Sequence, residues 1–303
     1  MDHSPELLAA LETGGTKMIG AVFTEDGKML SDITVPTGMP EDTMPALLSF
    51  FSKYTISAIG VSSFGPLQLT KGSPEYGTIT STPKPGWKNY PLGRTLGDTL
   101  HAPFAVETDV GGALIAEINE GAGRGCDTCV YATIGTGIGS AFIDRGKLTG
   151  TLRHATMGHI IVKPHPRDPF PDGFCSFHKG CLEGLASGKS MQTRWGMTVR
   201  DLPGSHISWE IESYYLAQFC VSLILGYMPE RIILGGGVMK HPDLLPMIRQ
   251  KVQVMLGEYL NLPEVHDDID RYIVRAELEG KNGILGAFYI AKQILNKRGV
   301  YNE

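Results

Sequence analysis

A group of cysteine and histidine residues in the middle of the chain constrains its folding more than any other feature. His159 precedes a run in which Cys175, His178 and Cys181 are spaced three residues apart. Thiolate sulfur and imidazole nitrogen are both ligands that zinc accepts, and this spacing lets one tight turn present three of them. The pattern predicts a four-coordinate zinc site, with His159 supplied from a preceding strand.

The segment 163–173 between these ligands contains four prolines and little apolar periodicity. We therefore expect that it does not fold without a tie, and that bound zinc is that tie. His165 lies inside the segment and competes with His178 as a ligand. The opposing interpretation, two buried thiols and two surface histidines, is disfavoured by the spacing.

Composition excludes several classes of protein. With 303 residues, 42% hydrophobic content and a net charge of −5, the chain can bury two domain cores. The absence of a basic run argues against nucleic acid or an anionic membrane as a partner. No segment reaches transmembrane length, and residues 1–6 do not resemble a targeting signal, so we expect a cytoplasmic protein. Besides the two zinc-ligand cysteines, three more, including the CxxC pair Cys126 and Cys129, are expected to be reduced core thiols.

Two glycine-rich segments repeat a common pattern in the two halves of the chain. Residues 13–17, TGGTK, precede an apolar strand and the turn EDGK, and residues 133–139, TIGTGIG, precede a second strand and the turn DRGK. Each is expected to form a β-hairpin, and the repeat indicates two related domains.

Both hairpins have the chemistry of an anion-binding turn. Glycines permit positive φ and let backbone N–H groups approach an anion closely, while threonine hydroxyls and Lys17 add donors. A single hairpin of this kind would be an ordinary turn. Two of them in related domains favour the binding of a polyphosphate.

A third glycine cluster, GGGVM at residues 235–239, follows the short apolar strand 231–234 and precedes a helix expected from about Asp243 to Leu260. A strand, glycines and a helix in this order present backbone groups and a helix N-terminus to a ligand. The spacing is not GxGxxG, so a Rossmann dinucleotide site is disfavoured.

Asp109 is the candidate catalytic group. It ends a strand expected over 105–109, near another buried strand at 57–63, and it precedes a helix expected over 111–120. Catalytic groups collect at this edge of α/β sheets. Asp is also common as a helix N-cap, where it contributes about 1 kcal/mol, and the sequence is compatible with both roles.

Together these motifs resemble the ROK (repressor, ORF, kinase) family of sugar kinases. ETGGTK, TDV with a later Glu117, ATIGTGIG, the MGH to GCLEG segment and LGGGVM follow the order of that family over nearly the whole chain. SSFGP at 62–66 and YGTITSTPKPGW at 76–87 resemble its fructokinase branch, as does the use of Glu at residue 12.

The resemblance implies an α/β fold of the actin-like (ribonuclease H-like) kind, in which ATP and sugar lie between two domains. It places a small N-terminal domain at residues 1–109, onto which a C-terminal helix at about 284–303 packs, and a larger domain at 110–283 with the zinc loop 159–181. The implied reaction is transfer of the γ-phosphoryl group of ATP, with Mg²⁺, to a hexose, and Asp109 is its general base. Fructose is the named substrate, and glucose and mannose are alternatives. A homodimer is also expected.

The resemblance further assigns binding residues. Those that face sugar are Thr108, Thr156, His159 and Glu183, and His159 uses one ring nitrogen for zinc and the other for sugar. Those that face ATP are Gly14, Gly15, Thr16, Lys17, Thr133, Gly135, Thr136, Gly137, Lys189, Gly235, Gly236, Gly237, Val238 and Met239.

Three positions depart from the family pattern. Thr156 replaces a glutamate that bonds sugar hydroxyls, which predicts weaker sugar binding. Gly111 stands where the fructokinase branch has Asn. Lys189 replaces a common proline and adds a cation near the nucleotide.

The resemblance leaves two alternative functions to consider, a sugar-responsive repressor and a sugar-binding protein without catalysis. The sugar-responsive repressors of the family add a helix-turn-helix domain, for which a first strand near Leu7 leaves no room. A sugar-binding module without catalysis is suggested by Thr156 alone, and Asp109 and the two hairpins argue against it.

Overall fold

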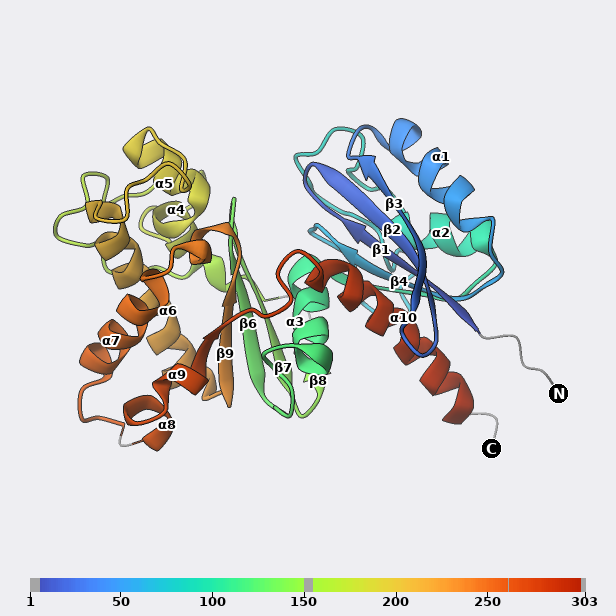
Figure 1. Cartoon of the computed structure of the whole chain (residues 1–303). Helices are drawn as coiled ribbons and strands as arrows, with labels where there is room; N and C mark the ends of the chain where they lie inside the picture. Colours follow the sequence, from blue (N-terminus) through green and yellow to red (C-terminus); the bar gives the residue numbers. More distant parts are fainter. Residues whose placement is uncertain (1–5, 150–154, 261, 301–303) are drawn as a thin grey trace. The chain divides into compact units, whose positions relative to one another are not determined.

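The computed structural model describes residues 6–149, 155–260 and 262–300. They form two compact units, 6–119 with 280–300 and 120–149 with 155–279, coloured by sequence in Figure 1. The first five residues, on which the expectation about a targeting signal partly rests, lie outside the described part. No helix of the described residues is long and apolar enough to cross a bilayer.

The first unit is built on a five-stranded sheet with the order β3-β2-β1-β4-β5. Strands β1 (Leu7–Thr13), β2 (Lys17–Thr24) and β3 (Met29–Pro36) form an antiparallel meander. Strands β4 (Ile56–Ser63) and β5 (Phe104–Thr108) continue the sheet parallel to β1. This arrangement brings the carboxyl ends of β1, β4 and β5 to one edge.

Alternation along the strands gives this sheet two buried faces. Ala9 and Leu11 face a core shared with helices α1 (Pro40–Phe51) and α2 (Leu92–Leu100). Leu8 and Ala10 face helix α10 (Asn282–Val300), the last helix of the chain. The C-terminal segment therefore packs on the N-terminal unit.

Helix α10 approaches the sheet very closely at one glycine. A Cβ atom at Gly60, in the middle of β4, would lie 1.9 Å from the carbonyl oxygen of Ala287 on α10. Only a residue without a side chain permits this distance between helix and strand. Helix α3 (Asp109–Glu120) contacts α10 in a similar way, since a Cβ at Gly286 would lie 2.1 Å from the carbonyl oxygen of Gly112.

The second unit repeats the topology of the first, with the order β10-β9-β6-β7-β8. Strands β6 (Cys129–Ile134), β7 (Ile138–Asp144) and β8 (Lys147–Leu148) are antiparallel neighbours. Strands β9 (Arg231–Gly235) and β10 (Ile273–Arg275) extend the sheet parallel to β6. Each strand of one unit thus has a counterpart of the same direction in the other, as the repeated hairpins predicted.

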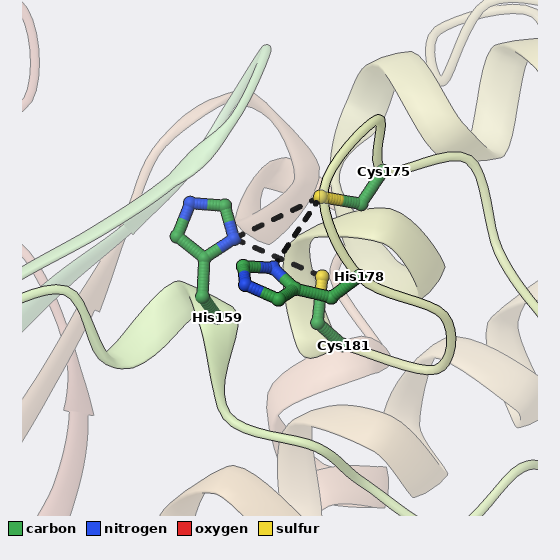
Figure 2. A group of neighbouring side chains, drawn as sticks. All are labelled: His159, Cys175, His178 and Cys181. Atoms are coloured by element: carbon green, nitrogen blue, oxygen red, sulfur yellow. Dashed lines mark hydrogen bonds between the residues drawn. The ribbon is translucent and has the colours of Figure 1, made fainter.

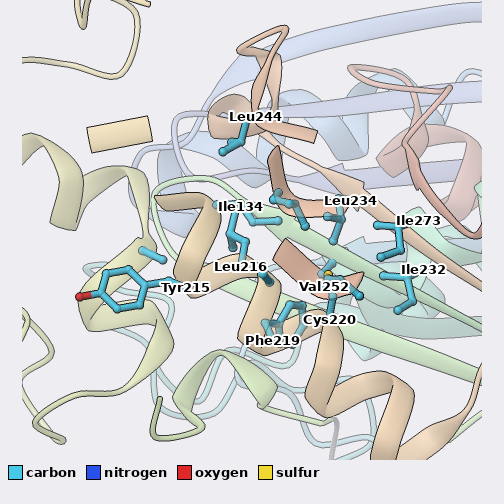
Figure 3. Close-up of a cluster of buried hydrophobic side chains, with 14 of the residues drawn as sticks. Ile134, Tyr215, Leu216, Phe219, Cys220, Ile232, Leu234, Leu244, Val252 and Ile273 are labelled. Carbon is cyan, nitrogen blue, oxygen red and sulfur yellow. The ribbon is translucent and has the colours of Figure 1, made fainter. Parts of the chain in front are cut away.

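A long buried helix, α6 (Ile207–Tyr227), forms the core of the second unit together with α7 (Leu244–Leu256). Figure 3 shows Leu216, Phe219 and Cys220 of α6 among Ile232 and Leu234 of the sheet. The expected helix over 243–260 ends at Leu256, because Gly257 adopts a positive φ of 55° that breaks the helical path.

Shorter helices complete the second unit and carry part of its site. They are η1 (Met157–His159), α4 (Leu182–Ala186), α5 (Gly188–Trp195), η2 (Gly237–Lys240), α8 (Pro263–His266) and α9 (Ile269–Tyr272). His159 therefore comes from a 3₁₀ turn, and the expectation that a strand supplies it is wrong. All five cysteines are free. Of the three expected to be core thiols, Cys129 and Cys220 are buried, whereas Cys126 is only half-buried.

The boundary between the units differs from the expected division at Asp109. Helix α3 up to Asn119 belongs to the first unit because it packs on β4 and α10 there. The return to the first unit occurs at Gly280, just before α10, close to the expected start at 284.

Candidate active site

Asp109 is the first residue of α3 and directly follows strand β5. The hydroxyl of Thr108 accepts a hydrogen bond from the N–H of Gly111 at 3.0 Å, which is the bond of a helix N-cap. Asp109 accepts hydrogen bonds from the N–H of Val110, at 2.9 Å, and from its own backbone N–H. Thr108 therefore supplies the helix N-cap, so Asp109 is not required for that role.

The environment of Asp109 suits a base. Its side chain is exposed at the surface, yet the protein atoms packed around it desolvate it enough to raise its pKa. The hydrogen bond from Val110 acts in the opposite direction but is the smaller effect. A carboxylate with a raised pKa accepts a proton more readily.

Glu12, which resembles the fructokinase branch in its residue type, lies near Asp109, and the sequence motifs assign it no part in the site. Desolvation raises its pKa, Lys17 lowers it, and the negative charge of Asp109 raises it further. Its carboxylate accepts a hydrogen bond from the N–H of Ile284 at the start of α10, and it packs so tightly on Gly283 that a Cβ there would lie 2.3 Å away. Because this contact joins residues 12 and 283, no local sequence pattern predicts that Glu12 belongs to the site.

The first glycine hairpin joins β1 to β2 as expected. The N–H of Gly14 donates to the carbonyl oxygen of Lys17 at 2.9 Å, and Thr37 holds the turn through the carbonyl oxygens of Gly14 and Thr16, at 2.9 and 3.0 Å. Gly15 and Thr16 are exposed, and Gly14 is half-buried. Within the described chain, the N–H groups of Gly15 and Thr16 have no protein acceptor.

The second hairpin joins β6 to β7 and is tied to the helices beside it. The N–H of Gly188 donates to the carbonyl oxygen of Gly135 at 2.7 Å, and the N–H of Ile138 donates to Glu183 at 2.9 Å. Thr136 is exposed at its tip, and Thr133 and Gly137 are half-buried. The exposed Lys189 follows Gly188 at the start of α5, so it lies close to this hairpin.

The third glycine cluster lies beside the second hairpin because β9 pairs with β6. Gly236 has a φ of 93°, and a Cβ there would lie 2.5 Å from the carbonyl oxygen of Ile134. Gly237 is exposed and has open space around it. Val238 and Met239 have buried side chains, so only their backbone can contact a ligand.

The predicted metal ligands come together in the second unit. The ligand atoms of His159, Cys175, His178 and Cys181 all lie within 4.8 Å of one another (Figure 2). Nδ1 of His159 is 3.9 Å from Sγ of Cys175 and 3.8 Å from Sγ of Cys181, and Nδ1 of His178 is 3.8 Å from Sγ of Cys175. Tetrahedral zinc with bonds of about 2.0–2.3 Å requires ligand separations only slightly shorter than these.

Backbone N–H groups point at the sulfur atoms of both cysteines. The N–H of Phe177 donates to Sγ of Cys175 at 3.5 Å, and the N–H of Gly184 donates to Sγ of Cys181 at 3.4 Å. The other ring nitrogen of His159, Nε2, faces Oε1 of Glu183 at 3.9 Å. The donor set and its supporting contacts fit zinc, and they connect the metal ligands directly to a predicted sugar contact.

His165 does not belong to this cluster. Its Nδ1 accepts the N–H of Arg167 at 3.1 Å, its Nε2 faces Glu210 at 4.0 Å, and its ring packs edge-on against Tyr214. These contacts hold it elsewhere in the proline-rich segment. His178 is therefore the fourth member of the metal cluster.

The proline-rich segment has a second tie that the sequence did not reveal. Asp168 faces Nε of Arg194 at 2.9 Å, with both side chains almost completely buried, and accepts the hydroxyl of Tyr215 at 2.6 Å. Arg194 also donates to the carbonyl oxygen of Leu185 on α4 at 2.8 Å and lies over the ring of Phe174, next to Cys175. The segment is thus held by this buried network as well as by any metal, which corrects the expectation that zinc is its only tie.

Thr156 lies immediately before the 3₁₀ turn of His159 and is exposed. Its carbonyl oxygen accepts the N–H of His159 at 3.0 Å, and its side chain makes no capping bond. A longer side chain at this position would have room to extend into solvent.

The predicted residues are divided between the units. Thr108, Asp109 and the first hairpin belong to the first unit, and the metal cluster, Glu183, Lys189 and the other two glycine clusters belong to the second. Within each unit, the predicted site residues of that unit lie close to one another.

Comparison of the sequence with known proteins supports the resemblance to ROK sugar kinases. The chain matches the ROK family over residues 8–294. A Bacillus subtilis protein, provisionally named a fructokinase, is 42% identical over 98% of this chain and 99% of its own. A fructokinase of Pediococcus pentosaceus is 37% identical over 95% of this chain and 99% of its own. A glucokinase of Halalkalibacterium halodurans is more distant, at 25% identity over 97% of each chain.

Solved structures agree on the fold. A ROK hexokinase from Thermus thermophilus superimposes with a TM-score of 0.79 at 24% identity, covering 96% of this chain and 99% of the other. A ROK glucokinase from Streptomyces griseus, solved with glucose and AMPPNP, has a TM-score of 0.70 at 26% identity, covering 95% and 99%.

The duplicated sheets, each with a glycine hairpin at the end of its first strand, define an actin-like two-domain fold of the kind that sugar kinases use. The family match extends over nearly the whole chain, including every motif described above. The chain belongs to the ROK family.

Proposed function

We propose that the protein transfers the γ-phosphoryl group of ATP to fructose and forms fructose 6-phosphate and ADP. The observation that carries this proposal is the similarity to fructokinases, 37–42% identical over nearly the full length of both chains, against 25% for a glucokinase. The exposed carboxylate of Asp109, with its raised pKa, supplies the chemical group that this reaction requires.

In this reaction the 6-hydroxyl oxygen of fructose forms a bond to the γ-phosphorus while the bond between that phosphorus and the bridging oxygen of ADP breaks. Asp109 accepts the hydroxyl proton and later releases it to water. Positioning and charge neutralisation supply most of the catalysis in phosphoryl transfer. One carboxylate that accepts a proton is therefore the only chemical group that the protein has to supply.

The three glycine clusters and Lys189 are the nucleotide-binding groups in this proposal. Open backbone N–H groups at Gly15 and Thr16 support a phosphate contact on the first unit. On the second unit, the hairpin at 135–137 and the exposed Gly237 offer backbone to the nucleotide. Mg²⁺ bound to the ATP substrate would neutralise part of the phosphate charge.

Sugar recognition falls on Thr108, Thr156, His159 and Glu183. Zinc bound by His159, Cys175, His178 and Cys181 would fix the ring orientation and tautomer of His159, so that its Nε2 side faces the sugar beside Glu183. Glu183 is further oriented by the N–H of Ile138. Thr108, on the first unit, accepts the helix-cap bond from Gly111 and keeps its own O–H donor for a sugar hydroxyl.

The test is ADP release with ATP, Mg²⁺ and a panel of fructose, glucose and mannose. Fructose is expected to give the highest kcat/KM. A preference for glucose or mannose would move the assignment to another sugar kinase of the family. A rise in melting temperature with fructose, without ADP release, would instead indicate a sugar-binding protein.

A further inference from the structure

Lys84 joins the two sequence motifs that resemble the fructokinase branch of the family. SSFGP at 62–66 supplies Phe64, and YGTITSTPKPGW at 76–87 supplies Lys84. The ammonium of Lys84 lies 4.8 Å from the centre of the Phe64 ring and donates a hydrogen bond to the carbonyl oxygen of Gly15 at 2.9 Å. Gly15 is the middle residue of the first glycine turn, so this lysine stands directly over the predicted phosphate site.

The chain holds Lys84 stiffly in this position. Pro83 and Pro85 flank it and restrict the backbone on both sides. Trp87, completely buried, packs edge-on against Phe64 and donates its indole N–H to the carbonyl oxygen of Gly38 at 2.8 Å. A lysine ordered in advance loses less side-chain entropy when it binds a ligand.

Phe64 is fixed to the same hairpin. Its N–H donates at 3.1 Å to the hydroxyl of Thr13, the last residue of β1, and Thr13 in turn donates to Ser63 at 2.8 Å. The aromatic platform, the lysine and the turn thus form one connected assembly. Only one of the three N–H groups of the ammonium is used by Gly15, which leaves two for an anion.

We propose that Lys84 is a phosphate-binding residue whose ammonium holds the terminal phosphoryl group of ATP at the turn of residues 14–16. This inference rests on the proposed function and assigns a role to a residue outside the predicted nucleotide contacts. Charge builds on the oxygens of the transferred phosphoryl group, and a positioned ammonium stabilises it. The open N–H groups of Gly15 and Thr16 complete the same anion site.

The competing role is that of a strap, in which Lys84 only fastens its loop to Gly15. Three substitutions separate the roles. Lys84→Arg keeps the charge, Lys84→Met removes both charge and hydrogen bond, and Lys84→Gln removes the charge but keeps an N–H donor for Gly15. Lys88→Met, at an exposed lysine of the same loop, is the matched control.

A phosphate-binding role predicts that Lys84→Met and Lys84→Gln lower kcat by about 10²-fold, comparable to removal of one transition-state donor. The KM for fructose should stay within about twofold, and Lys84→Arg should keep at least about a tenth of the wild-type kcat. Wild-type turnover with Lys84→Gln would overturn the proposal, because the strap would then be sufficient. Lys88→Met should behave as wild type.

Nucleotide titrations test the residue independently of the sugar. Lys84→Met should weaken binding of AMPPNP about tenfold and leave binding of ADP, which lacks the terminal phosphoryl group, within about twofold. Equal losses for both nucleotides, or none, would overturn the proposal. If the wild-type protein phosphorylated no hexose, the proposed function would fail, and these titrations would still decide the role of Lys84.

Discussion

At the scale of single residues, Thr108 and Asp109 divide two tasks that the sequence allowed either to perform. Thr108 caps helix α3, so Asp109 is free to act as a base. Asp109→Asn should therefore lower kcat by at least about 10²-fold and leave the free energy of unfolding nearly unchanged. Thr108→Ala should instead lower that free energy by about 1 kcal/mol. Steady-state kinetics and urea titration of both variants measure this contrast, and an Asp109→Asn enzyme with most of its turnover would exclude the base assignment.

Thr156 is the residue at which sugar affinity should respond most directly. The family carboxylate at this position would form charge-assisted hydrogen bonds with sugar hydroxyls, each contributing roughly 1.5–3 kcal/mol. Because Thr156 is exposed and its side chain caps nothing, a longer residue fits there. Thr156→Glu is predicted to lower the KM for the preferred hexose by about tenfold and to leave the KM for ATP unchanged. An unchanged or higher KM for sugar would mean that the site is adapted to a sugar for which threonine at residue 156 is the better contact.

At the scale of elements, the four candidate metal ligands lie next to Glu183, one of the proposed sugar contacts. We predict about one zinc ion per chain by elemental analysis, as a four-ligand set with these separations requires. Cys181→Ser should weaken sugar binding more than ATP binding, since Cys181 is followed within two residues by Glu183 and lies beside His159. Calorimetry with each ligand measures the difference. Metal-free protein with normal sugar affinity would contradict this prediction.

The buried network behind that loop should show itself as a pH effect. Burial raises the pKa of Glu212 well above its ordinary value, with Arg194 opposing and Asp168 adding to the shift. The folded state therefore holds this proton more tightly than the unfolded state. The resulting stability is complete below the ordinary glutamate pKa and is lost as the pH rises toward the folded pKa.

Glu212→Gln removes this titration with little change of shape. The free energy of unfolding of Glu212→Gln minus that of the wild type should therefore increase as the pH rises from about 5 to 8. Urea titrations at several pH values provide the measurement, with Glu258→Gln, at an exposed side chain outside this network, as a control for general effects. Parallel curves for wild type and Glu212→Gln would show that Glu212 does not titrate differently in the folded state.

The elements also show which parts of this molecule are legible in its sequence. Strands around residues 57–63 and 231–234, and both hairpins, lie within about one residue of their predicted positions, because apolar runs and glycines mark them locally. The spacing of the four candidate metal ligands also predicted that they lie together, and their ligand atoms are within 4.8 Å of one another. The contacts of Glu12 with Gly283 and of Arg194 with Asp168 could not be predicted from the sequence. Each joins segments that only the tertiary fold brings together.

At the scale of the whole molecule, the chain closes its first unit with its last helix. Leu8 and Ala10 at the beginning of the chain share a core with Ala287 and Phe288 near its end. The base, the first hairpin and Glu12 all belong to this unit, and the carboxylate of Glu12 bonds to the N-terminus of α10. Folding of half of the proposed active site therefore depends on helix α10, which lies far from β1 in the sequence.

Gly60 provides a local test of this dependence. The 1.9 Å between a Cβ at this position and the carbonyl oxygen of Ala287 means that Gly60→Ala must push α10 away from β4. Overpacking of this kind typically costs about 1–3 kcal/mol. Gly226→Ala, on the exposed surface of α6 with open space around it, should instead stabilise slightly, by up to about 1 kcal/mol. Hydrogen exchange resolves where each change acts: Gly60→Ala should deprotect β1, β4 and α10 while β6 and α6 keep their protection. Equal loss in both units would mean that α10 stabilises the chain as a whole and does not specifically complete the N-terminal unit.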